Sequence, residues 1–551
     1  MTPTPDAHAA AYPSGTRLRA WTRRRTRRHE SVPLSETLAD AHTILLTVAV
    51  ALAMGVGLAR GLAGDAADAL AAGATAQRHA LVLLDPSWLV AVGALLLLTA
   101  TWSITARLGP VGAPRHWRVW WLAAPGERRT LLRPALATPA LAAAALGMAA
   151  GLVVGLTVPV RGPTPGPAIL SVLAPAIGLA ALAVTGVAVQ ALAQVRAGQR
   201  PPVGLIRAAD VLLLLVVVAG VALALARPAA LALPGPTALA AATTAALALA
   251  AAAVRQADRT TDRLRDRALR SGGDVAAESA GALHSMDTRA LGRALDRATG
   301  PAAARGTRPG TERPWSASRL VRAAATRAPR TLRPQAALVA SDLILLIRTP
   351  RHVAQVVAGA LLTILALAVP GSSAVLIAGL AVGAYVAALA LVEGARQGQL
   401  APAIDAVLPL GQASVRATRL VLPALVLAWW GAAMLALSGG QLTPLGALAA
   451  AGAPLWAALG ALTGVGVAAG ALRGAYRPVP TFGGQPIVTP FGIVPPGLRE
   501  TVSTGPDVAI LALVPAAVAI VLGTVPPALL LVHVAVTAAA VALGLRRPKS
   551  T

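Results

Sequence analysis

The chain has no cysteine, and the only lysine among its 551 residues is Lys549. The absence of cysteine excludes disulfides, thiolate metal sites and cysteine nucleophiles. The phosphate-binding loop of many nucleotide hydrolases needs a Gly-Lys-Ser/Thr sequence. Lys549 is followed by Ser550 but preceded by Pro548. The chain therefore cannot hydrolyse nucleotide through such a loop.

Charged residues are also scarce, and they form no recognisable metal or catalytic motif. They make up 13% of the chain against 56% hydrophobic residues, which is too apolar for a soluble protein of this length. The eight histidines are scattered, and neither an HExxH motif nor a cluster with metal-ligand spacing occurs. We expect no metal, no other cofactor and no enzymatic activity in this chain.

Twelve apolar stretches fill most of the chain, each near the roughly 20 residues that a bilayer-spanning helix needs. They cover residues 41–61, 86–106, 135–157, 168–191, 209–226, 233–254, 352–370, 373–393, 420–438, 444–471, 507–523 and 525–545. Several contain proline, which spanning helices tolerate because neighbouring helices re-satisfy the freed backbone groups. The sequence predicts an all-α, polytopic membrane protein with about twelve transmembrane helices.

Arginine is concentrated in alternate gaps between these stretches. Seven arginines precede the first stretch, six lie in 107–134 and nineteen lie in 255–351. The gaps on the other side hold only Arg60, Arg78, Arg161 and Arg227. Because excess Lys/Arg marks the cytoplasmic side, both termini are predicted to be cytoplasmic. We interpret the net charge of +26 as this bias, together with attraction to anionic membrane lipids, and not as nucleic-acid binding.

The long gap at 255–351 divides the chain into two halves of six stretches. The expected parts are a basic N-terminal segment with an interfacial helix (1–40), a first six-helix half (41–254), a cytoplasmic linker with an amphipathic leading helix (255–351), a second six-helix half (352–545) and a short tail (546–551). Short matches recur at corresponding places, such as Pro139-Ala-Leu and Pro423-Ala-Leu in the third stretch of each half. We interpret the halves as parallel repeats related by an axis along the membrane normal.

The linker contains two distinctive basic segments. Arginine and aspartate alternate from Arg255 to Arg270. On a helix these residues would form opposite-charge pairs three or four positions apart, so we expect the sixth stretch to continue as a helix with internal ion pairs. From Trp315 to Arg333 basic residues alternate with apolar ones. This pattern fits a helix lying on the membrane surface, and equally a solvated basic linker.

The gap at 107–134 carries the most suggestive candidate site. Its tryptophans suit a membrane–water boundary. A Pro-Gly turn and a run of charges then follow on the cytoplasmic side. The candidate residues are Leu122, Pro125, Gly126, Glu127, Arg128, Arg129 and Arg133. This composition favours either a segment that contacts a soluble partner or simple anchoring of the helix ends at the interface.

At this gap the sequence resembles the permease subunits of ABC-2-type exporters. The resemblance lies in Leu122-Ala-Ala-Pro125-Gly-Glu-Arg128-Arg129-Thr-Leu131-Leu132, in Ala406-Val-Leu-Pro409-Leu-Gly411 at the same place in the second half, and in Ser341-Asp342 with Arg348-Thr-Pro350 before that half. It implies a separate ABC ATPase subunit bound at two coupling loops, the second including Leu408, Pro409, Gly411 and Arg416. The second loop carries fewer charges than the first, which puts equal coupling of the two halves in doubt.

Two other functions stay open at this point. Ionisable residues inside the stretches are few, and His533 and Glu393 are the candidates for an intramembrane polar site. A twelve-span secondary carrier would use such groups, and a non-transport membrane assembly protein would need none. Their scarcity favours an exporter permease in the bacterial cytoplasmic membrane, with an amphipathic or lipid-like substrate. Whether two copies of the chain assemble into a homodimer is open.

Overall fold

The computed structural model describes residues 14–26, 85–115, 117–123, 127–158, 160, 168–197, 203–226, 228–284, 292, 317–368, 373–442, 446–477, 487–489, 492–494 and 504–546. The predicted first span at 41–61 lies outside these residues. So do Pro125 and Gly126 of the predicted coupling site, and the tail beyond Arg546.

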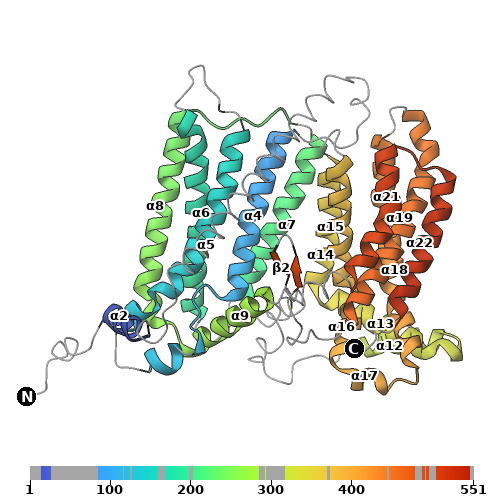
Figure 1. The fold of residues 1–551 in the computed structure, drawn as a ribbon, viewed down its shortest axis with the longest axis horizontal. Coiled ribbons are helices and arrows are strands. Elements are labelled where there is room, and N and C mark those ends of the chain that lie inside the picture. The colour runs from blue at the N-terminus through green and yellow to red at the C-terminus, as the bar shows by residue number, and fades with distance from the viewer. Residues whose placement is uncertain are drawn as a thin grey trace, which may run out of the picture.

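Long apolar helices make up most of the described chain (Figure 1). Nine of the described helices are long and apolar enough to cross a membrane. These are α4 (Pro86–Leu108), α5 (Arg128–Thr157), α6 (Ala168–Ala197), α7 (Val203–Ala226), α8 (Pro236–Thr260), α15 (Ser373–Leu391), α18 (Gln412–Leu442), α19 (Gly446–Ala475) and α22 (Pro527–Leu545). Each coincides with a predicted stretch. The helical, multi-pass membrane character expected from the composition is therefore confirmed.

Two further predicted stretches form helices of a different kind. The stretch at 352–370 is α14 (Pro350–Leu367), which meets α13 (Arg333–Arg348) at a bend of 77°. Pro350 is the first residue of α14 and fits this bend. Proline is favoured at the first position of a helix, and it disfavours the helical conformation in the residue before it. The stretch at 507–523 is α21 (Pro506–Leu522), an apolar helix of only 17 residues.

The helices form two groups side by side, joined at the middle of the molecule (Figure 1). The core of the second group is built by α15, α18, α19, α21 and α22, with fully buried side chains such as Leu427, Leu459 and Ile520. The smaller core of the first group lies among α4, α5, α6 and α8. A separate apolar cluster of Val92, Val217 and Leu365 joins α4 and α7 to α14. The two halves of the chain thus meet through α7 and α14.

Glycines allow the central helix pair of each group to pack backbone against backbone. A Cβ atom on Gly151 of α5 would lie 2.3 Å from the carbonyl oxygen of Pro175 in α6. A Cβ atom on Gly464 of α19 would lie 1.9 Å from the carbonyl oxygen of Leu427 in α18. In a bilayer the lipid chains are as apolar as the side chains, so close packing of small residues becomes a main source of helix association.

The two groups pair their helices in the same order, with one exception. In the first group α6 packs against α5 and α8, and in the second α19 packs against α18 and α22. The exception is the fifth helix of each half. Helix α21 packs against α19 and α22, whereas α7 packs against α4 and against α14 of the other half.

Shorter, more polar helices gather at one end of both groups, called the base here and drawn at the bottom of Figure 1. They are α2 (Gly15–Thr26), α9 (Asp266–His284), α12 (Ala317–Arg327), α16 (Glu393–Leu400) and α17 (Pro402–Ala406). Helix α13 also lies there, as does the short π-helix η2 (Trp117–Trp121). In the region 478–498 the described residues form a two-stranded antiparallel hairpin, β1 (Ile487–Thr489) and β2 (Gly492–Val494).

The predicted helical continuation of the sixth stretch is only partly correct. Helix α8 continues to Thr260, but a 3-10 turn, η3 (Thr261–Arg263), and the extended residue Leu264 then separate it from α9. Leu264 and Leu269 are fully buried in the first core. Burial of these leucines requires the chain to turn under the group, whereas a straight helix would carry them away from it.

Candidate functional site

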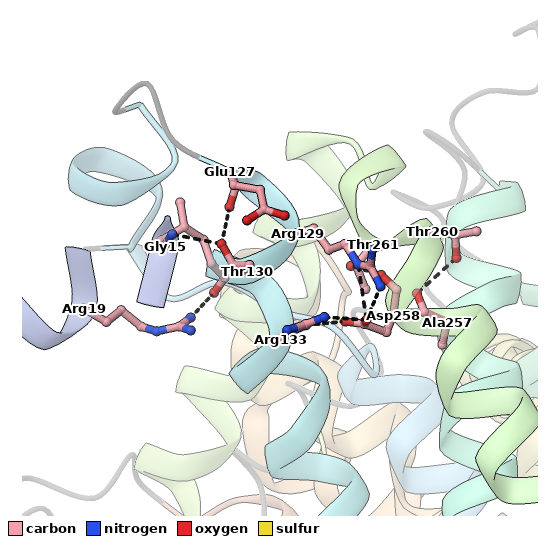
Figure 2. Close-up of polar contacts among 11 residues, drawn as sticks. Gly15, Arg19, Glu127, Arg129, Thr130, Arg133, Ala257, Asp258, Thr260 and Thr261 are labelled. Carbon is pink, nitrogen blue, oxygen red and sulfur yellow. Dashed lines mark hydrogen bonds and ion pairs between the residues drawn. The ribbon is translucent and has the colours of Figure 1, made fainter. Parts of the chain in front are cut away.

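The first predicted coupling loop, residues 122–133, ends in the first turn and a half of α5. Arg129 and Arg133 lie four residues apart and therefore project from the same face of that helix. Both reach Asp258 near the end of α8, at 2.5 Å from Arg129 Nη2 to Asp258 Oδ2 and 2.9 Å from Arg133 Nε to Asp258 Oδ1 (Figure 2). The Asp258 side chain is 19% exposed. One carboxylate thus holds two arginines from successive turns.

Arg128 and Arg118 are held by the chain that follows α8. Arg128 Nη2 lies 2.6 Å from Asp266 Oδ1 and donates a hydrogen bond to the Leu264 carbonyl. Arg118 Nη2 lies 2.9 Å from Asp274 Oδ1 in α9. The aspartates of the alternating segment were predicted to pair within that segment. That prediction is wrong for Asp258 and Asp266, because the fold places the start of α5 beside them.

Helix α2 contacts the start of α5 on the side opposite Asp258 (Figure 2). The Gly15 backbone N–H donates to Thr130 Oγ1 at 2.9 Å, and Arg19 donates to the Leu131 carbonyl at 2.8 Å. A side chain at Gly15 would collide with Leu131, since its Cβ would lie 2.7 Å from Leu131 Cγ. The arginine-rich N-terminal segment thus contacts α5 directly. The sequence offered no signal for this contact, which joins residues more than a hundred positions apart.

The tryptophans before the first loop and the remaining described residues of the loop lie wholly or partly at the protein surface. Trp120 is 73% exposed, and Trp117 and Trp121 are half-buried with their ring centroids 5.0 Å apart. Leu122 is half-buried and Glu127 is exposed. Among the described candidate residues of this loop, Glu127 and Arg133 are exposed, and Arg128, Arg129 and Arg133 form ion pairs within the chain.

The second predicted loop, residues 406–419, is more open than the first. It follows α17 and leads into α18. Val407 is 82% exposed, Pro409 and Gly411 are exposed, and Leu408 is half-buried. Arg416 is half-buried and makes contacts within the chain. Its guanidinium lies 4.5 Å from the centroid of the Tyr476 ring and donates to the Arg546 carbonyl at the end of α22. Burial raises the pKa of Tyr476 to about 12, so the phenol beside Arg416 stays neutral.

A buried ion cluster supports this second loop. Arg419 of α18 is 5% exposed, and its Nη2 lies 2.5 Å from Asp405 Oδ1 in α17. Its Nη1 lies 3.9 Å from Asp342 Oδ1 in α13. One guanidinium therefore ties together a leading helix, the loop and the third helix of the half. Arg419 and Asp405 were not singled out from the sequence, because partners on three different helices leave no spacing pattern.

The starts of α5 and α18 have equivalent surroundings. Each is held by the helix that leads into its half, α2 through Gly15 and Arg19 and α13 through Asp342. Each is also held by the end of the last helix of its half, α8 through Asp258 and α22 through the Arg546 carbonyl. Both loops therefore lie where three elements of a half converge at the base.

The two candidates for an intramembrane polar site are not brought together. Glu393 begins α16 and pairs with Arg396 at 3.1 Å. His533 is fully buried in the second turn of α22, with the Ala512 backbone beside its ring. Neither His533 ring nitrogen makes a hydrogen bond of normal geometry within the described residues. Each of the two candidates therefore has surroundings of its own, an ion pair for Glu393 and an apolar helix contact for His533.

Most of the chain matches the model of one protein family. Residues 78–485, from before α4 to beyond α19, match a family described as being of unknown function, DUF6297. This region contains both candidate loops and all residues of the Arg419 cluster. No curated protein and no solved structure matches the chain. Because the match covers well over half of the 551 residues, the chain belongs to this family of unknown function, DUF6297.

Proposed function

We propose that the chain is the transmembrane permease of an ABC-type exporter, powered by a separate ATPase subunit. The observation that carries this proposal is the equivalent position of the two loops. Each lies at the base, at the start of the third helix of a half, where a leading helix and a last helix converge. A force applied at such a junction would move three elements of the half together.

The proposed architecture has twelve spans, arranged as two six-helix repeats with both termini in the cytoplasm. The matched order of helix pairs supports it. The spacing of proline and glycine in the third helix of each half also supports it. Gly147 follows Pro139 by eight positions, and Gly431 follows Pro423 by eight positions. The base then faces the cytoplasm, which agrees with the arginine content of the segments there.

In the proposed mechanism, closure of two ATPases pushes on the two loops and rocks the halves about their shared contact. The first loop would pass the push to α8 through Asp258, and the second would pass it to α13 through Arg419. Both halves meet through an apolar cluster that contains no ion pair among the described residues. Few charged groups lie in the described spans, so the cargo would be amphipathic, lipid-like or drug-like.

Co-purification from the native host tests this proposal. The tagged chain, extracted in mild detergent, should bring down a soluble ATPase at near-integer stoichiometry. Val407→Asp should reduce its recovery at least tenfold, because it places an unpaired charge in the most exposed apolar position of the second loop. Ala277→Asp, an exposed change on α9, should leave recovery unchanged. Recovery of the ATPase at wild-type levels with Val407→Asp would place its binding site elsewhere.

A proton-coupled carrier is the second candidate, and His533 is the observation that favours it. A fully buried imidazole without a normal hydrogen bond in the described structure could carry a proton within a span. The test is transport into vesicles that contain the chain alone and carry a pH gradient. Gradient-driven uptake that is lost in His533→Gln would favour the carrier. Uptake that requires the partner and ATP would favour the permease.

A further inference from the structure

We propose that α12 and α13 form a platform that binds anionic phospholipid headgroups at the bilayer surface. The platform comprises residues 317–348. Its first support is orientation. Helix α14 is apolar and is a span in the proposed twelve-span architecture, and α13 meets it at 77°. Helix α13 therefore lies nearly parallel to the membrane plane where α14 leaves the bilayer, and Figure 1 shows α12 and α13 across the base of the second group.

The two sides of α13 have different partners. Leu338, which is 7% exposed, and Asp342, which pairs with Arg419, face the helix group. Leu343 and Ile347 lie on the other side and are 41% and 62% exposed. Exposed apolar residues continue into α14 with Val353 and Val357. Side chains of this kind on a surface-lying helix are stabilised when they enter the boundary between headgroups and acyl chains.

The platform also contains exposed arginines. Arg322, Arg327, Arg330 and Arg333 are exposed, and none has an ion-pair partner among the described residues. The single acidic residue between positions 317 and 348 is Asp342, whose carboxylate is engaged by Arg419. Guanidinium groups bind phosphate oxygens through paired hydrogen bonds, and a basic surface at the inner leaflet attracts anionic lipids.

The combination of charge and apolar surface identifies the ligand. A nucleic acid or an acidic peptide would satisfy the arginines but leave Leu343 and Ile347 in water. An anionic lipid surface offers phosphates to the arginines and hydrocarbon to the apolar side chains. The segment around α9 makes the contrast, since its arginines are interspersed with Asp262, Asp266 and Asp274. This inference goes beyond the proposed function and does not depend on an ATPase partner.

The test is a titration of the full-length chain in a neutral detergent with fluorescent phosphatidylglycerol or phosphatidylcholine. The unmodified chain should prefer phosphatidylglycerol. Each basic residue near an anionic surface contributes about 1 kcal/mol, roughly fivefold in affinity. The variant with Arg322, Arg327, Arg330 and Arg333 all changed to glutamine should therefore lose at least tenfold. Raising the ionic strength from about 0.1 M to about 1 M shortens the screening length from about 10 Å to about 3 Å and should weaken binding of the unmodified chain.

Two matched variants make the result specific. Changing the same four arginines to lysine keeps the charge and should keep most of the preference. Changing four exposed arginines at the end of α8 and the start of α9 to glutamine (Arg255, Arg259, Arg263 and Arg267) removes equal charge and should leave the preference intact. An equal loss in this control, or unchanged phosphatidylglycerol binding in the platform variant, would overturn the proposal. If the platform variant fails to fold, the salt titration of the unmodified chain still decides, because binding that salt does not weaken would also overturn the proposal.

Discussion

Replacing Arg419 with glutamine is expected to destabilise the second half by about 3–5 kcal/mol, the range for breaking a buried ion pair by removing one partner. Arg419 is 5% exposed and holds Asp405 at 2.5 Å and Asp342 at 3.9 Å. Without it, two carboxylates that are 18% and 10% exposed lose their countercharge. The measurement is the free energy of unfolding of the purified chain in detergent, followed by tryptophan fluorescence.

The matched control for this prediction is Arg416→Gln. Arg416 lies less than one turn away on α18, but it is half-buried and contacts the Tyr476 ring and a backbone carbonyl. We expect a loss of about 1 kcal/mol or less. Adding Asp405→Asn to the Arg419→Gln variant should restore part of the stability, because it removes one stranded charge. Equal losses of unfolding free energy for Arg416→Gln and Arg419→Gln would show that the buried ion cluster does not stabilise the second half more than the Arg416 contacts do.

Replacing Asp258 with asparagine is expected to have the second largest effect, because one carboxylate serves both Arg129 and Arg133. Hydrogen bonds to charged groups contribute about 1.5–3 kcal/mol each. Partial exposure of the two arginines, 35% and 51%, screens the interaction. We therefore expect a loss of about 2 kcal/mol for the whole cluster. Hydrogen exchange of residues 258–284 should also quicken, since this segment would lose its attachment to α5.

Two neighbouring aspartates, Asp262 and Asp266, provide controls for the Asp258→Asn prediction. Asp262 is exposed and makes no ion pair within the described part of the chain, so Asp262→Asn should leave stability and exchange unchanged. Asp266 pairs with Arg128, but its side chain is 64% exposed. Asp266→Asn should therefore cost less than about 1 kcal/mol, as is usual for surface ion pairs. If Asp262→Asn matched Asp258→Asn, the general charge of the segment and not the cluster would be responsible.

The two clusters bear on how the loops could be used. In the first half the arginines expected to face a partner are instead paired with Asp258 and Asp266. In the second half the corresponding segment exposes Val407, while Arg419 is buried and paired with Asp405. A partner that docks on both loops would therefore contact a charged, ion-paired surface at the first loop and an apolar turn at the second.

The positions of the helices follow from the amino-acid sequence alone. Each predicted stretch from 86–106 onward contains a helix that covers most of it, because a bilayer-spanning helix needs a long apolar run and nothing distant alters that need. The arginine-rich segments that form the base could also be identified in advance, since arginine positions are read directly from the sequence. Arg128, Arg129 and Arg133 stood out as unusual, but their partners could not be named.

Which charges meet depends on the way the helices pack. Asp258 lies within a segment whose spacing favours internal pairs, yet it binds Arg129 and Arg133 because α8 packs beside α5. Arg419 joins Asp342 and Asp405 from two other helices. The displacement of α7 toward α14 likewise reflects packing between halves. Spacing patterns record neighbours along one helix, whereas these contacts depend on how several helices converge, which no local pattern encodes.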